Sequence, residues 1–111
     1  MYKRFAAFAA VLGLALSVTV VEAAGDAAAG KRKFDTCMGC HGIPGYFNVY
    51  PSYRVPKLGG QNAQYLIQAL TAYQNGQRAH ETMRSQAASL SDRDIADIAA
   101  YLSGLSGTAG E

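Results

Sequence analysis

Two cysteines and a histidine lie close together in Cys37-Met38-Gly39-Cys40-His41, and no other cysteine occurs in the 111-residue chain. Two thiols separated by two residues can each add to a vinyl group of a porphyrin, and the following histidine can then ligate the iron. The spacing therefore favours covalent attachment of one haem through Cys37 and Cys40. It predicts a redox iron, with His41 as its first axial ligand.

Two other uses of a Cys-x-x-Cys pair fit the sequence less well. A structural zinc site needs four ligands, and the chain has no second cysteine pair to complete one. A thioredoxin-like disulfide lies in a βαβ unit, and no alternating or β-branched run predicts the strands of such a unit. A histidine directly after Cys40 favours haem attachment. A dithiol or disulfide role of the cysteine pair stays as the alternative.

A second axial ligand must come from elsewhere in the chain, and the candidates are Met83, His80 and Met38. Met38 lies inside the attachment motif and is tied to the proximal side. Met83 falls between two predicted helices, where a loop can bring it to the distal face of the haem. We expect Met83 to be the ligand. His80 would instead give a bis-histidine iron, and we expect it on the surface or beside a propionate.

Three helices are predicted around these residues. The first begins at Asp26, a good N-cap, and runs through Gly30 and Phe34 to the cysteine motif. Gly30 and Phe34 are four residues apart and share one face, so a neighbouring helix can approach closely at the glycine. We expect Phe34 to be a core residue.

The other two helices have clear beginnings and ends. Asn62 can cap the second helix, and Asn75-Gly76 can end it. Ser91 and Asp94 have the spacing of a capping box at the start of the third, which Gly104 can end. The apolar stripe of the third helix consists of Ile95, Ile98, Ala99 and Leu102.

The segment between His41 and Gln61 is rich in glycine, proline and tyrosine and has no regular pattern. An irregular loop of this length is unusual unless it wraps a ligand. Tyr46, Tyr50 and Tyr53 can press their rings on a porphyrin while their hydroxyls find polar partners. Arg54 can pair with a haem propionate or remain an ordinary solvated arginine.

The N-terminus predicts export. Lys3 and Arg4 precede an apolar run, and a small-residue cleavage site follows it, so we interpret residues 1–23 as a cleaved signal peptide and residues 24–111 as one domain. The run is long enough that an uncleaved membrane anchor is the alternative. The mature charge is close to neutral and does not suggest nucleic-acid binding. Lys31, Arg32 and Lys33 can steer an acidic partner or simply form a solvated helix face.

The chain resembles the small class I c-type cytochromes of bacteria over almost all of its mature region. The resemblance is carried by Gly30 with Phe34, the haem motif at residues 37–42, residues 57–61, Tyr65-Leu66, Met83 and residues 90–102. It implies an all-α fold of about three main helices and an irregular loop around one covalent haem c. It also implies that the first and last helices cross, with Gly30 and Phe34 against Tyr101.

The resemblance implies His41/Met83 ligation and single-electron shuttling in the periplasm between redox partner proteins, rather than enzyme catalysis. In this family a backbone carbonyl, often a proline's, orients the proximal histidine, and Pro51 is our choice among Pro44, Pro51 and Pro56. We expect a monomer that meets the membrane only if the signal peptide is uncleaved. The alternative function is a ligand-binding, sensing or peroxidase-like haem domain with an open sixth position.

Overall fold

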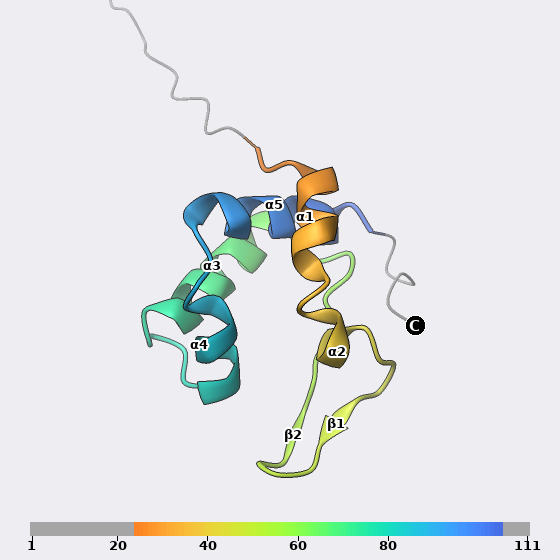
Figure 1. The fold of residues 1–111 in the computed structure, drawn as a ribbon, viewed down its shortest axis with the longest axis vertical. Helices are drawn as coiled ribbons and strands as arrows, with labels where there is room; N and C mark the ends of the chain where they lie inside the picture. The colour runs from red at the N-terminus through yellow and green to blue at the C-terminus, as the bar shows by residue number, and fades with distance from the viewer. Residues whose placement is uncertain (1–23, 106–111) are drawn as a thin grey trace, which may run out of the picture.

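The computed structural model describes residues 24–105, and this part of the chain is mostly helical (Figure 1). The elements in chain order are α1 (Ala27–Phe34), α2 (Met38–His41), β1 (Phe47–Asn48), β2 (Tyr53–Arg54), α3 (Ala63–Gln74), α4 (Glu81–Ala87) and α5 (Asp92–Ser103). The predicted signal peptide lies outside the described residues. Within residues 24–105, no helix is long and apolar enough to cross a membrane.

The three predicted helices are confirmed as α1, α3 and α5, and each begins at the predicted cap. The carboxylate of Asp26 accepts hydrogen bonds from the backbone N–H groups of residues 28 and 29. The Asn62 side chain accepts one from the N–H of Tyr65. Ser91 and Asp94 form the reciprocal capping box of α5. These contacts satisfy N–H groups that have no partner within the helix.

Helices α1 and α5 cross at Gly30, as predicted. A Cβ atom at this position would overlap the backbone carbonyl of Asp97 and lie only 2.9 Å from the Cβ of Tyr101. One turn later the rings of Phe34 and Tyr101 pack with centroids 5.8 Å apart and planes inclined at 52°. The glycine therefore permits a backbone contact that no other residue allows, and the two rings fill the space beside it.

Asp97 is a buried charge at the same crossing, with only 2% of its surface exposed. Its carboxylate accepts a hydrogen bond from the backbone N–H of Asp26 (2.7 Å) and pairs with Lys33 (2.7 Å) and Arg93 (3.1 Å). The Lys33 ammonium and the Asp26 N–H hold the pKa of Asp97 below its ordinary value. A buried carboxylate needs such partners because burial alone would favour its neutral form.

The core lies where α1, α3 and α5 meet. Its buried residues are Phe34, Leu66, Ile98, Ala99 and Leu102. The predicted apolar stripe of α5 is therefore confirmed, because Ile95 is also buried. Helix α4 packs against α3, and the Gln74 side chain donates to the backbone carbonyls of Ala87 (3.0 Å) and Leu90 (2.7 Å).

Two elements differ from the prediction. The segment after the haem motif is not wholly irregular: β1 and β2 form an antiparallel hairpin, with Phe47 opposite Arg54. The segment that contains Met83 is not a loop but helix α4, which begins after His80. Strands of two residues and a helix of seven are too short to leave a clear periodic pattern in a sequence.

The crossing predicts the effect of a methyl group at Gly30. We expect Gly30→Ala to destabilise the protein by about 2 kcal/mol or more, because the added atom overlaps backbone that cannot move freely. Gly104→Ala is the matched control, since the nearest atom to its added Cβ would lie 3.5 Å away. Urea unfolding of the two holo-variants measures the difference, and equal midpoints would contradict a close crossing.

The buried carboxylate predicts how stability depends on pH. The folded-state pKa of Asp97 is lowered relative to about 3.9 in the unfolded chain, so its stabilisation is present above about pH 4 and is lost as the pH falls further. Unfolding measured between pH 7 and pH 2 should show a smaller acid-induced loss in Asp97→Asn than in the wild type. The exposed Asp92→Asn serves as control and should follow the wild type; a wild-type profile in Asp97→Asn would refute the assignment.

Candidate functional site

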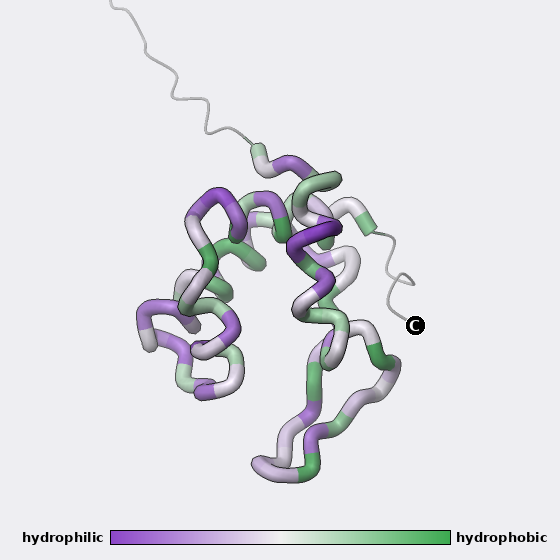
Figure 2. Tube along the Cα trace, viewed as in Figure 1, coloured by the Kyte–Doolittle hydropathy of each residue, from purple (hydrophilic) through white to green (hydrophobic). Residues whose placement is uncertain are grey.

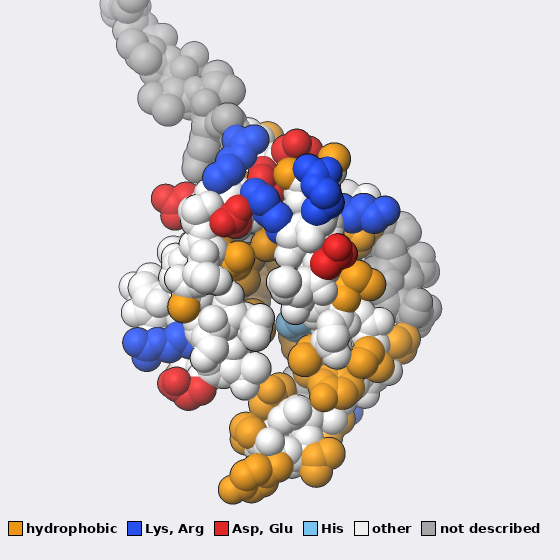
Figure 3. All heavy atoms as spheres, in the orientation of Figure 1, with side chains coloured by type: hydrophobic (Ala, Val, Ile, Leu, Met, Phe, Trp, Pro, Cys, Tyr) orange, Lys and Arg blue, Asp and Glu red, His pale blue; other side chains and the backbone are white. Residues whose placement is uncertain are grey.

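A cavity of about 470 Å³ lies between α2 on one side and α3 and α4 on the other, with α5 contributing to its wall. Figure 3 shows the molecule hollowed between these two sides, with histidine atoms visible inside. The volume is within the range of about 300–1,000 Å³ that is usual for cofactor and ligand pockets. Its lining includes both predicted thioether cysteines and both predicted iron ligands, namely Cys37, Cys40, His41 and Met83.

His41 is held by one of its two ring nitrogens. Its Nδ1 lies 2.8 Å from the backbone carbonyl oxygen of Pro56. A carbonyl can only accept, so Nδ1 carries the proton and donates, and Nε2 keeps the lone pair that a metal requires. The prediction of Pro51 as the acceptor is wrong, because its carbonyl accepts from the Asn48 side chain (2.7 Å) within the hairpin.

Cys37 directly precedes the single turn of α2, and Cys40 lies within it. Cys37 is the N-cap of this helix and packs against the core cluster, and both thiols are half-buried and not joined in a disulfide. Burial raises the pKa of the free Cys37 thiol. Because α2 follows α1 after three residues, the helix crossing at Gly30 also determines where the cysteines meet the cavity.

Met83 reaches the cavity from the opposite side. It lies in the first turn of α4, and Ala87 follows four residues later on the same helix face. Ala87 is fully buried, Met83 is half-buried, and both line the cavity. The cavity therefore has an imidazole on the α2 side and a thioether on the α4 side.

His80 has a role that the sequence did not reveal. Its Nδ1 accepts a hydrogen bond from the backbone N–H of Met83 (3.3 Å), so His80 is the N-cap of α4. Its ring packs edge-on against Tyr53, with centroids 4.6 Å apart, and against Tyr73 at 6.1 Å. His80 is thus half-buried in the cavity wall rather than on the surface.

Comparison with known proteins agrees with this arrangement. Residues 27–106 match the family model for cytochrome c. The chain belongs to the cytochrome c family. It is 51% identical over 83 residues to cytochrome c-554(548) of Halomonas halodenitrificans, and this alignment covers 72% of this chain and 96% of that protein. It is also 43% identical over 89 residues to cytochrome c4 of Pseudomonas aeruginosa, and that alignment covers 79% of this chain and 43% of the relative.

A solved structure gives the same result. Cytochrome c4 of Acidithiobacillus ferrooxidans superposes with a TM-score of 0.61 at 34% identity, over 77% of this chain and 53% of that one. The chain thus spans about half the length of the cytochrome c4 relatives. These comparisons confirm the predicted class I cytochrome c fold, the covalently attached haem c and an electron-transfer function. The relatives are electron-transfer cytochromes rather than enzymes in the usual sense.

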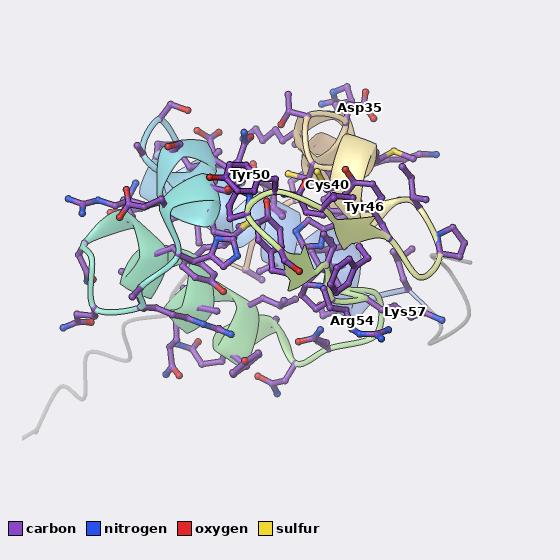
Figure 4. The ribbon with its side chains drawn as sticks, turned by 90° about the horizontal axis from the view of Figure 1, so that it is seen from below. Asp35, Cys40, Tyr46, Tyr50, Arg54 and Lys57 are labelled. Atoms are coloured by element: carbon purple, nitrogen blue, oxygen red, sulfur yellow. The ribbon has the colours of Figure 1, made fainter. Side chains whose placement is uncertain are left out.

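The tyrosines of this cytochrome are arranged differently from the prediction. Tyr53 lines the cavity, but Tyr46 does not, and Tyr50 is 95% exposed on the hairpin. Tyr65 and Tyr73, both from α3, line the cavity instead. The hairpin is nearest the viewer in Figure 4, where Tyr50 lies in front of the site.

Arg54 also lines the cavity, and its side chain is exposed. In Figure 4 it lies beside Lys57, on the other side of the hairpin from Cys40. A second arginine, Arg78, packs over the ring of Tyr73 at 4.7 Å and donates to the hydroxyl of Tyr65 (3.4 Å). Two guanidinium groups therefore lie at the cavity wall.

On the face drawn in Figure 3, charged side chains lie mainly over the helices and apolar ones over the hairpin. Lysine and arginine gather over α1 and α5, whereas apolar side chains cover the hairpin (Figure 3). Apolar segments reach the surface between α2 and β1 and at the hairpin turn, where Ile43 and Val49 are 48% and 81% exposed (Figure 2). Of the basic run, Lys33 is not free to steer a partner, because it pairs with Asp94 and Asp97 at 2.7 Å each.

Proposed function

We propose that this cytochrome is a periplasmic electron carrier whose haem is attached through Cys37 and Cys40 and ligated by His41 and Met83. The observation that carries the proposal is the cavity that has the Cys-x-x-Cys-His turn on one side and a methionine on the other. When bound, the haem supplies a one-electron couple between Fe(II) and Fe(III). A donor and an acceptor protein are the partners that such a couple requires.

The residues of the chain make the site suitable for electron transfer. The carbonyl of Pro56 accepts from His41 Nδ1, which leaves Nε2 as the ring nitrogen that can ligate the iron in both oxidation states. The thioether of Met83, as a soft and neutral ligand, favours Fe(II) and raises the reduction potential. Apolar side chains such as Leu66, Ile98 and Leu102 exclude water from the cavity wall, which disfavours the additional charge of Fe(III).

We further propose that residues 1–23 direct export and are removed, which leaves residues 24–111 as the haem domain. The support comes from Lys3, Arg4 and the apolar run that follows them. Export is consistent with the cysteines, because covalent attachment prevents a free pair from oxidising to a disulfide outside the cytoplasm. Mass spectrometry of the purified holo-protein would identify the first residue of the mature chain.

Covalent attachment predicts the outcome of extraction. Acid-acetone treatment of the denatured protein should leave the haem on the polypeptide, because thioether bonds survive conditions that break iron ligation. Cys37→Ser and Cys40→Ser should each keep one bond and change the pyridine haemochrome spectrum, whereas the double variant should release its haem. Complete release of haem from the wild type would refute attachment at these residues.

Met83 ligation predicts a spectroscopic and a redox change. In Met83→Ala we expect the weak band at the red edge of the visible spectrum of the oxidised protein to vanish. The reduction potential should fall by on the order of 0.1 V, a fraction of the about 0.8 V range set by axial ligands. The reduced variant should bind carbon monoxide.

Two variants control for this prediction. Met38→Leu removes the exposed methionine of α2 and should keep the band. His80→Ala tests the competing ligand. If the band survives in Met83→Ala and vanishes in His80→Ala, the distal ligand is the histidine.

A further inference from the structure

Tyr53 connects the hairpin to the helix that carries Met83. Its hydroxyl donates a hydrogen bond to Thr82 Oγ1 at 3.2 Å, across 29 positions of sequence. Its ring packs against the ring of His80, with the planes inclined at 73° and the centroids 4.6 Å apart. Thr82 directly precedes Met83 in the first turn of α4, and His80 caps that turn, so one side chain contacts the start of the helix at two residues.

The residues that follow Tyr53 lead to a contact with His41, the other proposed ligand. Three residues after Tyr53, the carbonyl of Pro56 accepts the hydrogen bond from His41 Nδ1. Three steps of extended chain span about 10 Å. Within this short segment, the backbone N–H of Val55 also donates to the carbonyl of Tyr46 (3.1 Å), which fixes it to the other arm of the hairpin.

Helix α4 depends on such contacts because it is too short to be stable alone. It has seven residues, and isolated helices shorter than about 12–15 residues are marginal in water. Gln74 holds its C-terminal end through the carbonyls of Ala87 and Leu90. At its N-terminal end, where Met83 lies, Tyr53 contacts Thr82 and His80, His80 caps the helix, and the His80 ring also packs against Tyr73 of α3.

We infer that Tyr53 is a positioning residue for Met83: it holds the first turn of α4 against the cavity and links that turn, through β2, to the carbonyl that orients His41. The inference rests on the proposed His41/Met83 ligation. It assigns to one segment, residues 53–56, the control of both axial ligands. Tyr53 itself acts on Met83 only through Thr82 and His80.

Competition by imidazole tests the inference in the oxidised holo-protein. Imidazole can bind the iron only in molecules in which Met83 is displaced, so its apparent affinity is proportional to that fraction. Tyr53→Phe keeps the ring and removes the hydroxyl. Because a neutral hydrogen bond contributes about 0.5–1.5 kcal/mol, we expect imidazole to bind about two- to tenfold more tightly to this variant. The loss of the red-edge band during titration measures the binding.

Further variants make the test specific. Thr82→Val removes the acceptor and should produce the same increase, and the double variant with Tyr53→Phe should exceed neither single variant, because both remove one bond. Tyr50→Phe removes the hydroxyl of a side chain that is 95% exposed and should bind imidazole as the wild type does. His80→Asn retains a capping acceptor and should bind imidazole less tightly than His80→Ala.

The possible results separate this inference from the proposed function. If the red-edge band survives in Met83→Ala, the ligation is wrong and the inference fails with it. If Met83→Ala loses the band but Tyr53→Phe binds imidazole like the wild type, the ligation stands and only the inference is overturned. Additive effects in the double variant would also overturn it, since the two side chains would then act independently.

Discussion

The backbone contact between α1 and α5 at Gly30 is the constraint on which the rest of the structure depends. It places the start of α1 close enough to α5 for the Asp26 N–H to reach the buried carboxylate of Asp97. Phe34 then enters the core one turn after the crossing, and the cysteine turn follows directly. A small shift at Gly30 would therefore move the attachment site of the haem as well as the core.

The elements that supply the proposed axial ligands have little stability of their own. Helix α2 is a single turn, α4 has two turns, and the strands that lead to Pro56 have two residues each. Such short elements are positioned by tertiary hydrogen bonds, here from Pro56, Tyr53 and Gln74. The long helices α3 and α5 provide the rigid wall, and the short elements present the side chains that face it.

The parts of the fold that sequence predicted correctly are those governed by local rules. Asp26, Asn62 and Ser91 are standard caps, and the stripe on α5 has helical spacing, so three helices could be located without a structure. The haem motif is a local pattern of the same kind. Spacing alone places Gly30 and Phe34 on one helix face, but the resemblance to a family was needed to name α5 and Tyr101 as their partners, because the crossing is a long-range contact.

The parts that were missed depend on contacts between distant residues. The choice of Pro56 over Pro51 requires knowing that a hairpin turns the Pro51 carbonyl towards Asn48. His80 is not a preferred capping residue, so its role at α4 became visible only beside Met83 and Tyr53. In sequence, the buried Asp97 was one more charge on a helix, because its partners Asp26 and Lys33 are more than 60 residues away.

In this small domain the cofactor and the core are parts of one structure. The described residues bury few large side chains completely, and the residues around the cavity include core members such as Phe34, Leu66, Ile98 and Leu102. A chain of this size buries a limited fraction of its surface and often needs a covalent or metal-based staple. The cavity wall that excludes water from the haem therefore also supplies the hydrophobic burial that keeps α3, α4 and α5 together. Because α4 is not part of the contact between α1 and α5, changes that loosen α4 should affect the proposed ligation before they affect that crossing.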